Sequence, residues 1–228
     1  TENVSKEAKA AKEAYDALSD AQKALVNAQA KDKAAAIEAA LADVNAFEKA
    51  VEEFADIITA EDMDEMVMLE NQYENLSDAE IALIVDETED KYNGLFTQAK
   101  ALNHKSGNVE LIDAPWYIKI TASEIAQPSE AMKKAYDEQE AVFLGDIEIG
   151  IYTEDGYFNK ETADANVGAL LENEAPFTVA FDIAKLASYN NVRVLHEKAD
   201  GTVEEIKAKV SGTTVTVETE HFSPYAVV

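Results

Sequence analysis

Hydrophobic residues in the first 105 positions follow a helical spacing. The longest stripe recurs every three or four residues and consists of Ile37, Leu41, Val44, Phe47, Val51, Phe54 and Ile58. This spacing places all of them on one face of a helix. Proline is absent before Pro115, and Gly94 is the only glycine before Gly107, which also favours helices. Because the stripe is longer than one small bundle needs, we expect its helix to run between two helical units as a shared rod.

The helical region also contains a duplicated sequence. The segment 15–26 matches 73–84, so that Tyr15 aligns with Tyr73, and the register then holds without a gap through Asp32-Lys33 and Asp90-Lys91. Counted backwards, Thr1 aligns with Thr59. We therefore predict two antiparallel three-helix units, at about residues 1–58 and 59–105.

Each copy predicts the same local structure. The first helix ends at Leu18 or Leu76, and Ser19 or Ser77 caps the next short helix by accepting a hydrogen bond from an unpaired backbone N–H. Thr59 is a further predicted cap, at the start of the second unit. In the first copy Tyr15 and Leu18 lie three residues apart on one face, where we expect them to meet Leu25 or Val26.

After residue 105 the pattern changes to strand-like alternation. Alternating apolar residues predict strands around 116–121, 147–152, 177–183, 192–196, 203–210, 213–219 and 222–228. Asp200-Gly201 predicts a hairpin turn, and Ser129–Glu140 predicts a short helix after Pro128. The polar segment 103–108 marks the junction, where we expect Gly107 to end the last helix. The predicted fold class is thus α+β in two domains, a helical repeat domain at 1–105 and an antiparallel, immunoglobulin-like β-sandwich at 106–228.

The composition of the chain excludes several classes of partner and site. The net charge of −27 repels phosphate backbones and anionic membranes, so we expect no nucleic-acid partner. The absence of cysteine excludes disulfides, zinc–thiolate sites and a cysteine nucleophile. No apolar run approaches the roughly 20 residues that span a bilayer, so direct membrane insertion is not expected. A start at Thr1 without a signal peptide suggests an excised fragment.

Two segments carry a resemblance to known proteins. The string Ala14–Val26 resembles the helical repeats of large cell-wall and extracellular proteins of Gram-positive Firmicutes, which have a Tyr-x-x-Leu-Ser/Thr core. The run from Val192 to Val227, with its His221-Phe222-Ser223-Pro224-Tyr225 ending, resembles β-modules of the same class. This resemblance implies a secreted protein at the cell surface or in the cell wall. It supplies no catalytic residue.

Histidines, a serine and acidic clusters are the candidates for chemistry. His196 and His221, with Glu197 or Glu220, contain the ligand types of a metal site, but local hydrogen bonding at strand ends is the favoured interpretation. His104 is expected to be exposed in the junction loop. Ser223 lacks a Gly-x-Ser-x-Gly motif and is expected to shape the entry to the last strand. Acidic residues at 61–65 and 86–90 lack calcium-loop spacing and are expected at helix starts. No catalytic residue, metal or cofactor is therefore predicted.

Aromatic residues are the strongest candidates for ligand binding. Tyr152, Tyr157 and Phe158 lie around the turn Glu154-Asp155-Gly156. An exposed group of rings there could stack on a sugar. The further aromatic candidates are Trp116, Tyr117 and Tyr189. The alternative is that most of these rings are packed. The predicted function is a non-catalytic structural or adhesive segment, expected to be a monomer, whose partner is a host or plant glycan or an extracellular protein. The alternative is a carbohydrate-binding accessory module of a large extracellular glycosidase.

Overall fold

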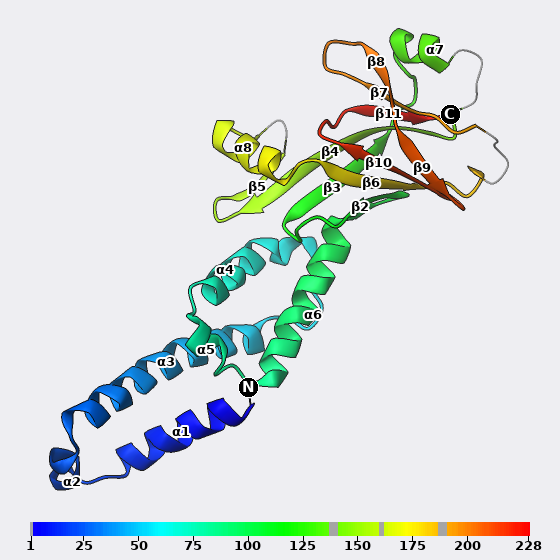
Figure 1. Ribbon diagram of the computed structural model, residues 1–228. Coiled ribbons are helices and arrows are strands. Elements are labelled where there is room, and N and C mark those ends of the chain that lie inside the picture. Colours follow the sequence, from blue (N-terminus) through cyan, green and yellow to red (C-terminus); the bar gives the residue numbers. More distant parts are fainter. Residues whose placement is uncertain (1, 137–140, 160–161, 187–190) are drawn as a thin grey trace. The chain divides into compact units, whose positions relative to one another are not determined.

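The computed structural model describes residues 2–136, 141–159, 162–186 and 191–228. Contacts between residues divide the chain into two compact units, Thr1–Gln98 and Ala99–Val228. The first unit is helical, and the second contains two antiparallel sheets, so the chain has an α+β fold (Figure 1). We refer to them as the helical unit and the β unit. Tyr189 lies outside the described residues.

The helical unit begins with the predicted capped helices. Its elements are α1 (Glu2–Asp16), α2 (Asp20–Leu25), α3 (Ala28–Glu53), η1 (Ala60–Asp62), α4 (Met63–Glu74), α5 (Asp78–Ile81) and α6 (Asp86–Asn103), of which α6 continues into the β unit. The Ser19 and Ser77 hydroxyls each accept a hydrogen bond from the backbone N–H three residues later. In turn, the side chains of Gln22 and Glu80 accept from the backbone N–H of Ser19 and Ser77. Thr59 caps η1 in the same reciprocal way. The three predicted caps are therefore confirmed.

Helix α3 is the central element of this unit. It contacts α1 as well as α4 and α5 (Figure 1). Its buried face contains Leu41, Val44, Phe47 and Val51, as the stripe predicts. The stripe nevertheless overestimates the helix, because α3 ends at Glu53 and Phe54 adopts an extended backbone. Ile58 is buried outside the helix.

Of the two residues expected to meet Tyr15 and Leu18 in the first copy, Leu25 does not do so in a closed core, because it is 87% exposed. Val26, the other, is half-buried, as are Tyr15 and Leu18. Leu83, its counterpart in the second copy, is only 7% exposed. The two copies share a local sequence, but only the second is enclosed by neighbouring helices.

The β unit has two antiparallel sheets. The first contains β1 (Lys105–Ser106), β2 (Val109–Ile112), β6 (Phe177–Asp182), β10 (Thr214–Thr219) and β9 (Ala208–Ser211), in that order. The second contains β3 (Ile118–Glu124), β4 (Phe143–Thr153), β11 (Pro224–Val227), β7 (Val194–Glu197) and β8 (Val203–Ile206), with β5 (Gly156–Asn159) paired to β4. A single cluster of buried side chains draws from both sheets, including Val179 and Val217 of the first and Ile147 and Val194 of the second.

Two short helices pack on the β unit. Helix α7 (Glu130–Tyr136) places Met132 against Leu195 and Ala226 of the second sheet, and the Ser129 hydroxyl caps it by accepting from the Met132 N–H. Positions 137–140 of the predicted helix lie outside the described residues. Helix α8 (Ala165–Glu174), which the sequence pattern did not predict, packs Leu171 against the main core cluster.

Several predicted boundaries in the β unit need correction. The strand expected at 203–210 is divided at Lys207 into β8 and β9, which belong to different sheets. Strands β1, β2 and β5 were not expected. Gly107 does not end a helix: it has a φ of +62° in the turn between β1 and β2, a left-handed conformation that favours glycine.

Candidate functional site

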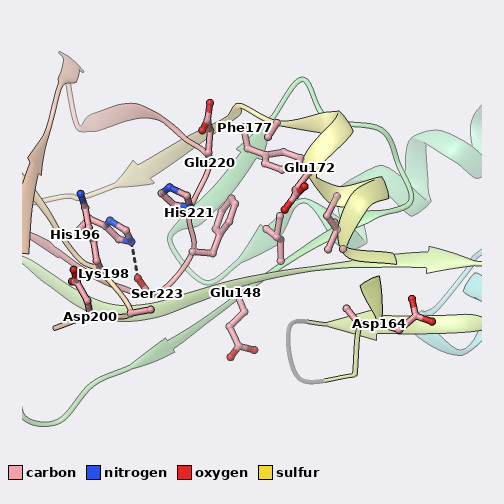
Figure 2. Close-up of a pocket in the computed structure, with 17 residues that line it drawn as sticks. Glu148, Asp164, Glu172, Phe177, His196, Lys198, Asp200, Glu220, His221 and Ser223 are labelled. Carbon is pink, nitrogen blue, oxygen red and sulfur yellow. Dashed lines mark hydrogen bonds between the residues drawn. The ribbon is translucent and has the colours of Figure 1, made fainter. Parts of the chain in front are cut away.

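The β unit contains an open cavity of about 970 Å³. Four segments far apart in the sequence line it: β4, the region of α8, the β7–β8 turn and the residues just before β11. Figure 2 shows that the side chains lining it include the carboxylates of Glu148, Asp164, Glu172 and Glu220 and the rings of His196 and His221. The cavity therefore combines a largely apolar wall with acidic and imidazole groups.

A chain of hydrogen bonds joins a serine, a histidine and a glutamate beside this cavity. The Ser223 Oγ lies 2.6 Å from His196 Nε2, and His196 Nδ1 lies 3.1 Å from Glu204 Oε1 (Figure 2 shows the first of these). The His196 side chain is 1% exposed, whereas that of Glu204 is 38% exposed and also binds Lys198. This order of groups is the one that activates a serine nucleophile in many hydrolases.

The same hydrogen bonds also link three neighbouring strands. His196 lies on β7, Glu204 on β8 and Ser223 immediately before β11, and the sheet order places β7 between the other two. The Ser223 hydroxyl has a second acceptor, since the backbone oxygen of Glu197 lies 2.5 Å away. The Ser223 hydroxyl can therefore donate to either of two acceptors, the Glu197 backbone oxygen at the end of β7 or the His196 ring.

The protonation of His196 decides between these roles. Burial lowers the pKa of His196 from its usual value, and the Glu204 carboxylate partly opposes that shift. A neutral ring with its proton on Nδ1 donates to Glu204, and its Nε2 accepts a hydrogen bond from the Ser223 hydroxyl. With the proton on Nε2, the ring donates to Ser223, whose own proton then goes to Glu197.

The carboxylate that binds His196 is that of Glu204, and not that of Glu197 or Glu220. The Glu197 carboxylate turns to α7, where it accepts from the Ser129 hydroxyl at 2.7 Å. Glu220 is exposed at the cavity rim. Glu204 was missed, although the hairpin centred on Asp200 pairs it directly with His196. The register of that predicted hairpin was the signal that could have identified it.

His221 and His196 do approach each other. Their rings are nearly parallel, at 11°, with centroids 6.4 Å apart, and Tyr225 lies 4.8 Å from the His196 ring on a tilted geometry. Both nitrogens of His196 are already hydrogen-bonded. Among the described residues, no group of three or more His, Asp or Glu side chains is placed to hold a metal ion.

His104 is not in an exposed loop as expected. It is buried immediately after α6, and its Nε2 lies 2.8 Å from the backbone oxygen of Pro115. Burial lowers the pKa of His104. Asn103 beside it donates to the backbone oxygen of Trp116, so the two side chains tie the end of α6 to the segment before β3. Trp116 itself is buried.

The three candidate aromatic residues lie on adjacent strands, but they do not form an open platform. Tyr152 is 8% exposed, Phe158 packs against the main core cluster, and Tyr157 is 36% exposed. The Tyr152 and Tyr157 rings lie 4.8 Å apart, and the Lys119 ammonium is 5.4 Å from the Tyr157 centroid. Burial next to Tyr152 raises the pKa of Tyr157. One ring of the three thus has substantial contact with solvent.

Gly150 explains how Tyr157 is held. A Cβ at position 150 would meet the Tyr157 hydroxyl and would lie 2.6 Å from the backbone oxygen of Phe158. A side chain at this position of β4 would therefore displace Tyr157 or the backbone of β5. The placement of Tyr157 is therefore built into the sheet.

The acidic clusters lie at helix starts, as predicted. Asp62 accepts from the Thr59 backbone N–H and hydroxyl, and Asp86, Glu87 and Glu89 fall in the first turn of α6. Carboxylates at these positions stabilise the positive end of the helix dipole. Their positions need no ligand to account for them.

Comparisons with protein-family models, with curated proteins and with solved structures found no match to this chain. Within the part of the chain that the structure describes, no helix is both long enough and apolar enough to cross a membrane.

Proposed function

We propose that the chain is a non-catalytic structural or adhesive segment of a secreted, cell-wall-associated bacterial protein. In this proposal the helical unit consists of two repeats that act as a spacer. The β unit is an immunoglobulin-like β-sandwich that acts as a packing or binding unit. The location rests on the resemblance of the Ala14–Val26 and Val192–Val227 segments to such proteins.

The packing of α3 is the observation that carries the spacer role. This single helix contacts α1 of the first copy and both α4 and α5 of the second, so one element is shared by consecutive copies. A helix of 26 residues is about 39 Å long. Sharing such a helix extends the structure with each copy instead of closing it into a globule.

Small-angle X-ray scattering of the full chain tests this role. A compact protein of 228 residues has a radius of gyration of about 17 Å. A spacer requires a clearly larger radius and an asymmetric distance distribution. A monomer with a radius close to 17 Å would refute the proposal.

Carbohydrate binding is the alternative role of the β unit, with an extracellular glycosidase as the parent protein. The exposed face of Tyr157, fixed over Gly150 and next to the Lys119 ammonium, is the observation that favours it. Binding to a glycan array that is lost in Tyr157→Ala would support this role. Tyr136→Ala is a matched control, since that tyrosine lies on α7 and away from this strand pair.

Serine-dependent acyl transfer is a second candidate function, and the Ser223–His196–Glu204 hydrogen-bond chain favours it. A fluorophosphonate probe tests it directly, because the probe modifies only an activated serine. Stoichiometric labelling that disappears in Ser223→Ala would support catalysis and overturn the non-catalytic proposal. We expect no labelling, since the Glu197 backbone oxygen competes for the same proton.

A further inference from the structure

Equivalent positions in the two sequence copies differ sharply in burial. Leu25 is 87% exposed, whereas Leu83 at the matching position is 7% exposed. Ile84 is buried, whereas its counterpart Val26 is half-buried. The residue types are the same or similar, so the difference comes from what lies next to each copy.

The second half of α3 lies next to the second copy. The Phe47 ring packs against Tyr73 and Tyr92, with centroid distances of 5.5 and 5.4 Å. The Glu48 carboxylate accepts from the Val85 backbone N–H at 3.0 Å. Two side chains of α3, the Phe47 ring and the Glu48 carboxylate, therefore contact the second copy.

Lys91 binds the carboxyl end of α3. Its ammonium donates to the backbone oxygens of Glu52 and Phe54, at 3.1 and 2.8 Å. These oxygens belong to the carboxyl end of α3, where a positive charge stabilises the unpaired carbonyls. Lys91 thus fixes where α3 stops along the second copy.

The first copy keeps the groups that make these contacts. Tyr15 stands where the second copy has Tyr73, and Lys33 stands where it has Lys91. Lys33 is exposed and Tyr15 is half-buried. Among the ring contacts, Ala34 stands in place of Tyr92, which removes a ring and leaves more room for an incoming side chain.

We propose that Tyr15, Leu25, Val26 and Lys33 form a docking surface for one amphipathic helix. The occupant has the pattern of the second half of α3: a phenylalanine within a valine stripe, and a carboxyl end that Lys33 caps. Another copy of residues 1–58, placed directly before Thr1, would supply such a helix. The inference deepens the proposed spacer function, because it gives the surface through which copies would stack.

The absence of cysteine from the chain makes this surface easy to probe. Leu25→Cys introduces a single thiol, and its rate of modification by a maleimide measures exposure. The rate is compared between the full chain and the same chain carrying a further copy of residues 1–58 before Thr1. We expect the added copy to slow modification by about tenfold or more, because a docked site must open before it reacts.

Three controls keep the result interpretable. Val210→Cys, in the β unit and 47% exposed, should react at the same rate in both chains. Leu83→Cys should react slowly in both and gives the rate of a docked position. In the added copy, an aspartate in place of the phenylalanine equivalent to Phe47 should restore fast modification of Leu25→Cys.

An unchanged rate at Leu25→Cys, or an added copy without further helical circular dichroism, would overturn the proposal. Protection that persists after the aspartate substitution would also overturn it, since docking would not be its cause. A compact scattering profile of the original chain would instead refute the spacer role. The maleimide experiment would still test the docking surface independently of that result.

Discussion

Leu25 and Leu83 offer a matched pair of substitutions, with the same residue at equivalent positions of the duplicated sequence. Leu83→Ala removes a side chain that is 7% exposed, and Leu25→Ala removes one that is 87% exposed. Truncating a buried leucine costs about 2–5 kcal/mol, through lost burial and the cavity left behind. A surface truncation changes the free energy of unfolding by about 0.5 kcal/mol or less. We therefore expect the two variants to differ by at least about 1.5 kcal/mol.

The chain contains probes for both units. Far-UV circular dichroism during thermal unfolding reports mainly on the helices. Trp116, the only tryptophan, lies in the β unit, so its fluorescence reports there. For a unit of this size a loss of 2 kcal/mol lowers the midpoint by about 8–16 °C. Leu83→Ala should shift the helical transition by at least this amount, and Leu25→Ala should leave it nearly unchanged.

Two outcomes would refute the reasoning. A small effect of Leu83→Ala would mean that Leu83 is not buried in solution as it is in the structure. A large effect of Leu25→Ala would mean that Leu25 is already covered in solution, for example by self-association. Measuring the midpoint at several protein concentrations separates that second case, because an association-dependent midpoint rises with concentration.

Three further predictions concern the β unit. Gly150→Ala should destabilise it by about 1–3 kcal/mol in urea unfolding, because the new methyl group meets the Tyr157 ring, whereas Gly168→Ala in α8 has open space and should be neutral or stabilising. The lowered pKa of His196 predicts that stability is fully present above pH ~6.5 and is lost as the pH falls below it, since the unfolded state then binds the proton first; His196→Gln should flatten that dependence in unfolding curves measured against pH. Burial raises the pKa of Tyr225 to about 12, so stability should be lost as the pH rises from about 10 towards 12, and Tyr225→Phe should reduce that loss, to which Tyr157 also contributes because burial raises its pKa.

Local signals in the sequence predicted local structure well. The capping serines and the turn at Asp200-Gly201 act within a few residues, and each was found where its pattern placed it. The core faces of β4 and β6 also followed from strict alternation. The length of α3 was overestimated, because an apolar stripe continues past Glu53 even though the backbone does not. Ile58 is buried although it lies outside the helix, and its backbone N–H donates to the Gln98 side chain.

Contacts between distant segments could not be predicted in the same way. The alternation in the 203–210 segment breaks at Glu204-Glu205, and it is regular from Ile206 to Val210, so nothing at Lys207 itself shows that the chain changes sheets there. His104 was expected to be exposed, because its neighbours in the sequence are polar. Its burial depends on Pro115, which only the β-unit fold brings next to it. Short strands such as β1 and β5 are likewise fixed by their partners.

The candidate site shows how one set of contacts serves two interpretations. Ser223, His196 and Glu204 have the order and distances of a catalytic serine site, yet they also join β11, β7 and β8. These roles differ in what the serine proton does, and the Glu197 backbone oxygen at 2.5 Å places a structural acceptor within its reach. Ser223→Ala separates them: a pin between strands loses about 1 kcal/mol or more of stability, whereas a nucleophile loses probe labelling with little change in stability. Loss of stability without any labelling of the original chain is the result that the structural role requires.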